Sequence, residues 1–93
     1  MKHLLIAAPS FLRELRKLIK RRPEVDADVH GVLQLMEEDP RHPLLKTHRL
    51  KGELSAYWAC SAGYDLRIVF RFTKHGVLPA IELEHVGTHD EVY

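Results

Sequence analysis

The fold is decided by one stretch of the sequence, DLRIVFRF, which occupies residues 65–72. Its apolar and charged side chains alternate with a period of two, which predicts a β-strand buried on one face. The face predicted to lie on the core carries Leu66, Ile68, Phe70 and Phe72. The opposite face carries Asp65, Arg67, Val69 and Arg71. This strand therefore predicts a sheet with one buried face and one charged face that no helix covers.

The rest of the chain supplies three more strands and two helices. Aromatic and β-branched runs predict the strands, which span residues 3–6, 57–60 and 80–86. Apolar residues at helical spacing predict the helices, which span residues 11–22, with Ser10 as the N-cap, and 25–39. This order predicts an α+β domain in which both helices pack on one face of a mainly antiparallel four-stranded sheet.

Length and composition favour a single domain spanning residues 1–93. Such a small core leaves no room for a separate cofactor-binding domain, and no small-molecule cofactor is expected. The single cysteine, Cys60, lies in an apolar segment, where a core role is expected rather than a nucleophilic one. No apolar run reaches the ~20 residues of a membrane span. The apolar run at the N-terminus is also too short for a signal peptide. We therefore expect a cytoplasmic protein without a membrane partner.

Basic and acidic residues are segregated along the chain, although 14 Lys and Arg against 13 Asp and Glu leave a formal charge of only +1. The first helix is basic, the second is acidic, and the loop over residues 41–52 is basic again. Solvated helix faces and cross-strand ion pairs are the usual explanation of such blocks. A cationic loop beside Arg67 and Arg71 would instead form a surface that binds phosphate groups, and both interpretations stay open.

Seven histidines invite a metal site, but their spacing argues against one. His85 and His89 are four residues apart with His85 in a predicted strand, where this spacing does not bring two side chains together as it does on a helix. No cysteine pair accompanies them. We therefore expect no metal.

Histidines also suit metal-free cleavage of RNA, because an imidazole titrates near pH ~6.5. In that reaction a base takes the proton of the ribose 2′-OH, and the 2′ oxygen attacks the adjacent phosphorus. A cation then stabilises the negative charge, and an acid protonates the leaving 5′ oxygen. Asp65 or His48 would be the base, Arg67 the cation and His89 the acid.

Four segments carry a resemblance to a known family, namely residues 11–15, 45–52, 64–70 and 87–93. With these segments the chain resembles the RelE/ParE superfamily of toxins from type II toxin–antitoxin systems, and most closely its YafQ-like and RelE/StbE-type members. The resemblance implies the fold of the RelE-like microbial RNases and a metal-independent endoribonuclease. Such an enzyme enters the A site of the 70S ribosome, binds its rRNA, cleaves the mRNA there and is silenced by a cognate antitoxin.

The resemblance also implies roles for single residues. His48 matches the loop histidine of YafQ-like toxins, Asp65 their strand carboxylate and His89 their C-terminal catalytic histidine. Tyr93 matches their terminal aromatic residue, which would stack on a base, and Arg67 matches the strand arginine of RelE-like and YoeB-like relatives. The residues expected to contact RNA phosphates are Lys46, Arg49, Lys51 and Arg71.

Two positions depart from the YafQ-like pattern. Ser61 stands where that pattern has a second histidine, and Leu66 stands where it has an aromatic residue, so the identity of the base stays open. The same superfamily includes ParE-type toxins that inhibit DNA gyrase. The alternatives to the nuclease are therefore a gyrase inhibitor and a nonenzymatic RNA-binding module on the same fold.

Overall fold

A computed structural model describes residues 2–63 and 65–92 of the chain, so the expected stacking residue Tyr93 lies outside the described residues. The strands are β1 (Leu4–Ala7), β2 (His48–Arg49), β3 (Trp58–Ser61), β4 (Leu66–His75) and β5 (Leu78–Thr88). The helices are α1 (Pro9–Arg21), α2 (Val25–Glu38) and α3 (His89–Val92), with short 3-10 helices η1 (Pro43–Leu45) and η2 (Gly52–Leu54). No helix of the described part of the chain is long and apolar enough to cross a membrane.

Within the described residues the sheet has five strands in the order β1-β5-β4-β3-β2, which corrects the expected count of four. β1 runs parallel to β5, and the other neighbours are antiparallel, so the sheet is mixed. The fifth strand, β2, lies inside the segment predicted as a loop. It has only two residues, which is too short for an alternating pattern to mark it.

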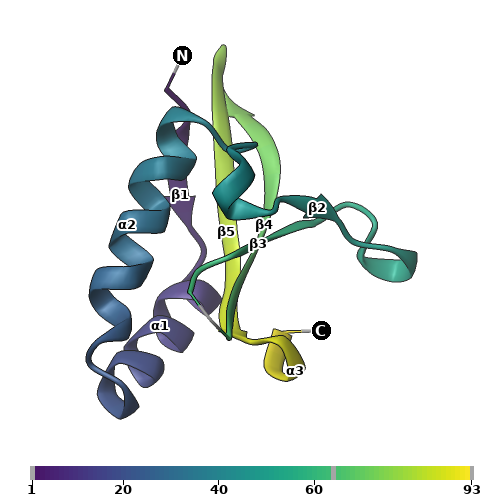
Figure 1. Ribbon diagram of the computed structural model, residues 1–93. Coiled ribbons are helices and arrows are strands. Elements are labelled where there is room, and N and C mark those ends of the chain that lie inside the picture. The colour runs from purple at the N-terminus through teal and green to yellow at the C-terminus, as the bar shows by residue number, and fades with distance from the viewer. Residues whose placement is uncertain (1, 64, 93) are drawn as a thin grey trace.

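Helices α1 and α2 lie together on one side of the sheet, as predicted (Figure 1). α1 begins at Pro9 with Ala8 as its N-cap, so the expected N-cap Ser10 is wrong. A proline is well suited to the first helical position because its φ is already helical and its missing N–H needs no partner there. Ser10 instead donates its hydroxyl to the carbonyl oxygen of Glu84, at 2.7 Å, and so ties α1 to β5.

The core forms where the helices meet β4. The predicted core face of β4 is confirmed, since Leu66, Ile68 and Phe70 are buried and Phe72 packs at the edge of the same cluster. Cys60 is fully buried, as predicted for a core residue, and its Sγ lies 3.9 Å from Sδ of Met36. This burial raises the pKa of the Cys60 thiol to about 12, so the thiol stays protonated at neutral pH.

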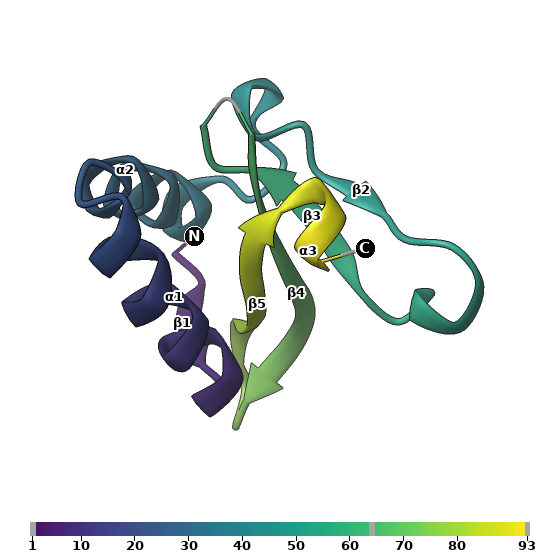
Figure 2. The same ribbon diagram turned by 90° about the horizontal axis from the view of Figure 1, so that it is seen from below.

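The opposite side of the sheet is called the distal face here, and it carries Arg67, Val69 and Arg71 of β4. We expected no helix on this face, but α3 contacts both β4 and β5 and lies on the side away from α1 and α2 (Figures 1 and 2). A β-bulge also changes the face, because Val69 pairs with His85 whereas Phe70 pairs with Leu83, so that Glu84 is the additional residue of β5. A bulge shifts the alternation by one residue.

Candidate functional site

The strand register brings His48 and Arg67 to the distal face, as the sequence predicted for Arg67. His48 pairs with Ala59, and Ala59 pairs with Val69. Directly paired residues point to the same face of a sheet, so His48 and Val69 share the distal face. Arg67 lies two residues before Val69 on β4 and therefore points to that face as well.

The His48 ring is oriented by a backbone contact. Its Nδ1 lies 3.0 Å from the carbonyl oxygen of Lys46. A carbonyl oxygen only accepts hydrogen bonds, so Nδ1 carries the proton and donates it. In the neutral ring the basic nitrogen is then Nε2, which is the form that a general base needs.

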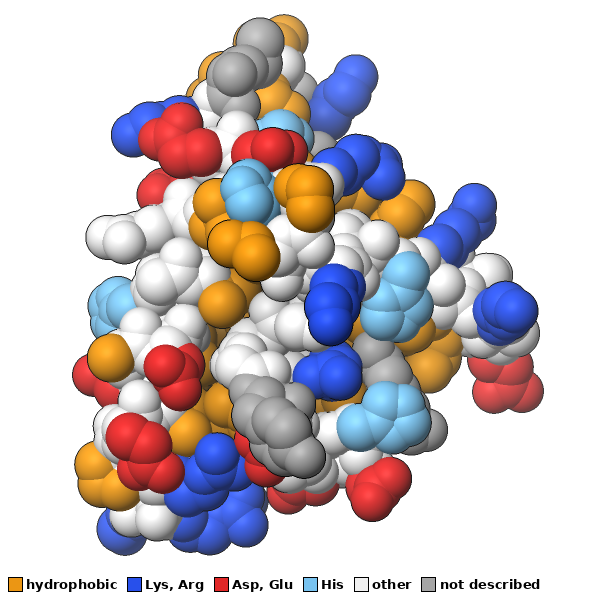
Figure 3. Space-filling view, in the orientation of Figure 1, with side chains coloured by type: hydrophobic (Ala, Val, Ile, Leu, Met, Phe, Trp, Pro, Cys, Tyr) orange, Lys and Arg blue, Asp and Glu red, His pale blue; other side chains and the backbone are white. Residues whose placement is uncertain are grey.

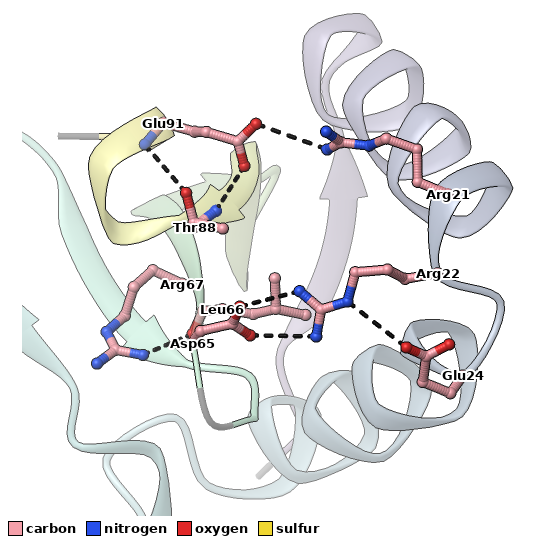
Figure 4. A network of polar contacts seen from close by, with 8 residues as sticks. All are labelled: Arg21, Arg22, Glu24, Asp65, Leu66, Arg67, Thr88 and Glu91. Carbon is pink, nitrogen blue, oxygen red and sulfur yellow. Dashed lines mark hydrogen bonds and ion pairs between the residues drawn. The ribbon is translucent and has the colours of Figure 1, made fainter.

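His89 is positioned by a capped helical turn. Thr88 pairs with Leu66, directly beside Arg67, and α3 begins at the next residue. The Thr88 hydroxyl accepts from the Glu91 amide at 3.3 Å, and the Glu91 carboxylate accepts from the Thr88 amide at 2.9 Å (Figure 4). This reciprocal pair is a capping box, and it lowers the pKa of Glu91. The Thr-x-x-Glu spacing was visible in the sequence, but α3 was not predicted.

Helix α1 holds this turn in place. Nη2 of Arg21 lies 3.6 Å from the Glu91 carboxylate (Figure 4). Gly87 permits the close approach of α3 to β5, because a Cβ at this position would lie 3.2 Å from atoms of Glu91 and Val92. The segment that carries His89 is thus fixed to both the sheet and α1.

We expect Gly87→Ala to loosen α3 while leaving the rest of the fold intact. The added methyl group needs space that the Glu91 and Val92 side chains occupy. Amide exchange over residues 88–92 should become faster by roughly 5-fold or more, which corresponds to losing a helix cap worth ~1 kcal/mol. Gly31→Ala is the matched control, because a Cβ there meets nothing within 4 Å. Unchanged exchange over 88–92 in Gly87→Ala would contradict this account of α3.

Asp65 does not join Arg67 on the distal face, which corrects the prediction that they share it. Its carboxylate accepts two hydrogen bonds from Arg22, at 2.9 and 3.2 Å, and Figure 4 shows it pointing away from Arg67. β4 begins only at Leu66, so the strand alternation does not extend to Asp65. The Arg22 guanidinium lowers the pKa of Asp65, which weakens this carboxylate as a base. The contact fixes the β3–β4 turn to the end of α1.

This ion pair makes the stability of the fold depend on pH. The lowered pKa means that the contribution of the pair is present above the pKa of an unfolded aspartate and is lost as the pH falls through the folded value. Asp65→Asn lacks this contribution at every pH. We expect the difference in Tm between the parent chain and the variant to be largest near neutral pH and to shrink below pH ~4. A difference that does not change with pH would refute this role.

Two cations meet at one cavity. Lys46 and Arg67 both line a cavity of about 720 Å³ between α2, η1 and the end of β3, together with Ser61. Lys46 reaches this position through a left-handed backbone conformation with φ of 52°. Figure 3 shows Lys, Arg and His side chains gathered over β2 and β3, whereas acidic side chains lie over α2. The segregation of charge in the sequence therefore becomes a segregation between surfaces.

The other three predicted phosphate contacts differ in their surroundings. Arg71 lies 2.6 Å from the Glu82 carboxylate and 3.7 Å from that of Glu84, so the cross-strand ion pair is confirmed and already balances its charge. The Arg49 guanidinium donates from Nε to the carbonyl oxygen of Ser55 at 2.7 Å and holds the loop after β2. Lys51 is exposed at the start of η2. Within residues 2–63 and 65–92, no three His, Cys, Asp or Glu side chains are placed to hold a metal ion.

Two helices on one face of a β1-β5-β4-β3-β2 sheet and a short C-terminal helix on the other face make up this fold (Figure 1), and the solved structures that share it include toxins. The chain is similar to a YoeB/ParE toxin from Agrobacterium tumefaciens, with 19% identity over 92% of this chain and 98% of that chain and a TM-score of 0.77. It is similar to YafQ in the E. coli DinJ-YafQ toxin–antitoxin complex, with 16% identity, 100% and 99% coverage and a TM-score of 0.76.

A third similar structure is a copper-bound mutant toxin from Helicobacter pylori, with 24% identity, 100% coverage of both chains and a TM-score of 0.72. No protein-family model and no curated protein matches the chain. Identities this low establish the fold and leave the function to be argued from the site. The resemblance seen in the sequence is thus confirmed for the fold.

Proposed function

We propose that this chain is the toxin of a type II toxin–antitoxin system and cleaves mRNA in the ribosomal A site. The observation that supports the proposal is that His48 and Arg67 share the distal face by strand register and that α3, which begins with His89, contacts β4 and β5. The shared fold with proteins titled YoeB, ParE and YafQ toxins supports it. Work on ribosomes would place the protein in the cytoplasm.

We assign one step of the reaction to each residue. His48, with Nδ1–H held by a carbonyl oxygen, takes the 2′-OH proton at Nε2. The Arg67 guanidinium stabilises the charge that develops on the phosphate, and His89 protonates the leaving 5′ oxygen. Lys46 and Lys51 would hold neighbouring phosphates. Asp65 is a positioning residue in this scheme, because its carboxylate binds Arg22 and so fixes the start of β4, which carries Arg67, to the end of α1.

A translation extract separates this function from its alternatives. Purified protein should cut messages inside codons only when ribosomes translate them, and the new ends should carry 2′,3′-cyclic phosphates. Intact messages combined with loss of DNA supercoiling by gyrase would favour the ParE-type activity. Intact messages and unaffected gyrase would favour a nonenzymatic module.

Removing metals should leave cleavage unchanged, because imidazoles and a guanidinium supply all the charges and protons of the reaction. The test is cleavage on programmed ribosomes with and without 1,10-phenanthroline, which binds transition metals while the ribosomes keep their Mg²⁺. We expect rates that agree within about 2-fold, well under the losses of general acid–base variants. A collapse of the rate that added zinc restores would replace this mechanism by a metal-dependent one.

The proposed partner that silences the toxin is an antitoxin protein, as in the DinJ-YafQ complex. Helix α1 offers it a basic surface, formed by Arg13, Arg16, Lys17, Lys20 and Arg21. Such a surface favours association with an acidic segment. Co-expression with a small adjacent open reading frame should restore growth of cells that produce the toxin.

A further inference from the structure

A small cavity on the distal face is not used by the proposed reaction. It has a volume of about 170 Å³ and is lined by Leu54, Tyr57, Val69, His85 and Val92. Its residues come from η2 and the loop after it, from the neighbouring strands β4 and β5, and from α3. Four of the five carry apolar or aromatic side chains, with one imidazole among them. A small cavity lined by apolar and aromatic side chains, with an imidazole as a hydrogen-bonding group, is suited to one aromatic ring.

The imidazole of His85 is held in one orientation by a carboxylate of α1. Nδ1 of His85 lies 3.0 Å from the carboxylate of Glu14 on α1, and the same carboxylate accepts from the Val86 amide at 3.1 Å. A carboxylate that binds two donors is an acceptor only, so Nδ1 carries the proton. In the neutral ring Nε2 is then an acceptor. The His85 side chain is 47% exposed, which leaves this edge accessible to a ligand.

The cavity lies beside the proposed catalytic groups. Val69 follows Arg67 by two residues on the same face of β4, a separation of ~7 Å along a strand. Val69 also belongs to the row of paired residues that ends at His48, and Val92 belongs to the same short helix as His89. A base in the cavity would therefore lie about one nucleotide away from a phosphate held by Arg67.

We propose that this cavity binds one base of the RNA and selects a base with an exocyclic amino group, adenine or cytosine. The N6 or N4 amino group donates to Nε2 of His85, whereas the O6 of guanine or the O4 of uracil would place a second acceptor against it. Tyr57 and Val69 contact the faces of the base. That the base belongs to a message rests on the proposed function, while the cavity and its preference do not.

The first test uses the protein alone with AMP, CMP, GMP and UMP, followed by NMR of the Val69 and Val92 methyl groups. We expect AMP and CMP to shift these signals with a preference of roughly 2- to 10-fold over GMP and UMP, the range of one net hydrogen bond. Long-range proton–nitrogen correlation should show the Nδ1–H tautomer of His85. Equal affinities for all four nucleotides, shifts only elsewhere, or the Nε2–H tautomer would each overturn the proposal.

Variants separate base selection from a merely structural role. His85→Ala should remove the preference. Glu14→Gln, which keeps the size of the side chain, should weaken it, because an amide no longer requires a proton on Nδ1. His30→Ala on α2 is the control, since His30 is exposed and pairs with Asp26 one turn before it on the same helix. A preference that survives in both His85→Ala and Glu14→Gln would refute the assignment.

Cleavage then distinguishes this proposal from the proposed function. Mapping of cut sites should show one codon position enriched in adenine or cytosine, with the enrichment lost in His85→Ala. Cleavage whose base preference is unchanged in His85→Ala would overturn the cavity proposal and leave the nuclease intact. Selective AMP and CMP binding by a protein that cleaves no message would support the cavity and overturn the nuclease.

Discussion

Replacing His89 by glutamine is expected to lower the rate of message cleavage by about 100-fold or more, the usual loss when general acid–base catalysis is removed. The leaving 5′ oxygen needs a proton, and a glutamine amide of similar size has none to give near neutral pH. The fold should remain, because the His89 side chain is 65% exposed at the start of α3. Single-turnover cleavage on programmed ribosomes measures the effect on chemistry separately from product release.

His30→Gln is the matched control for this loss. It changes an exposed histidine of α2 that pairs locally with Asp26, and it should leave the cleavage rate unchanged. Thermal unfolding of both variants should match that of the parent chain. An undiminished rate in His89→Gln would remove His89 from the reaction and would leave His48 as the only proposed acid–base group.

The sequence predicted those elements of the fold whose hydrophobic pattern extends over many residues. The alternation over β4 placed Leu66, Ile68 and Phe70 in the core correctly, because ten residues of strand hold the period. The same rule failed one residue earlier, at Asp65, where the strand has not yet begun. The Asp65 carboxylate instead binds the guanidinium of Arg22, 43 residues away in the sequence. A local sequence pattern cannot predict a partner at that separation.

The features that the sequence did not predict are short or depend on tertiary contacts. β2 has two residues, and the bulge at Glu84 changes register without any glycine or proline to mark it. The pairing of His85 with Glu14 spans 71 positions and exists only because α1 lies against β5. Predicting these features required the register of the sheet, which a single strand pattern does not contain.

The candidate site shows the same division. Chemistry and resemblance both indicate His48 and Arg67, and the register places both on the distal face. The same alternation indicates Arg71, yet Glu82 lies directly opposite it on β5 and binds it. The sequence did contain this signal, since Glu82 and Glu84 were visible at alternate positions of the predicted neighbouring strand. The alternation of a strand therefore predicts which cations share a face. It does not predict which of those cations is already paired with a carboxylate.

Phe70 is fully buried, stacks edge to face on Phe72 at a centroid distance of 5.4 Å, and pairs with Trp58 on one side and Leu83 on the other. It thus lies at the centre of the contact between β3, β4 and β5. A cavity at this position removes apolar contacts from both helices and strands, and rigid neighbours cannot close it fully.

Phe70→Ala is therefore expected to lower the free energy of unfolding by about 3–5 kcal/mol, a large part of the ~5–15 kcal/mol that a domain of this size has. The Tm should fall by roughly 12 °C or more. Thermal or urea unfolding followed by circular dichroism measures the change, and Val77→Ala, at a side chain that is 93% exposed, should stay within about 0.5 kcal/mol of the parent chain. A loss below ~1 kcal/mol in Phe70→Ala would place the centre of the core elsewhere. Because β4 carries Phe70 on one face and Arg67 and Val69 on the other, the same substitution should also abolish cleavage above the lowered Tm, which the exposed-site variant should not.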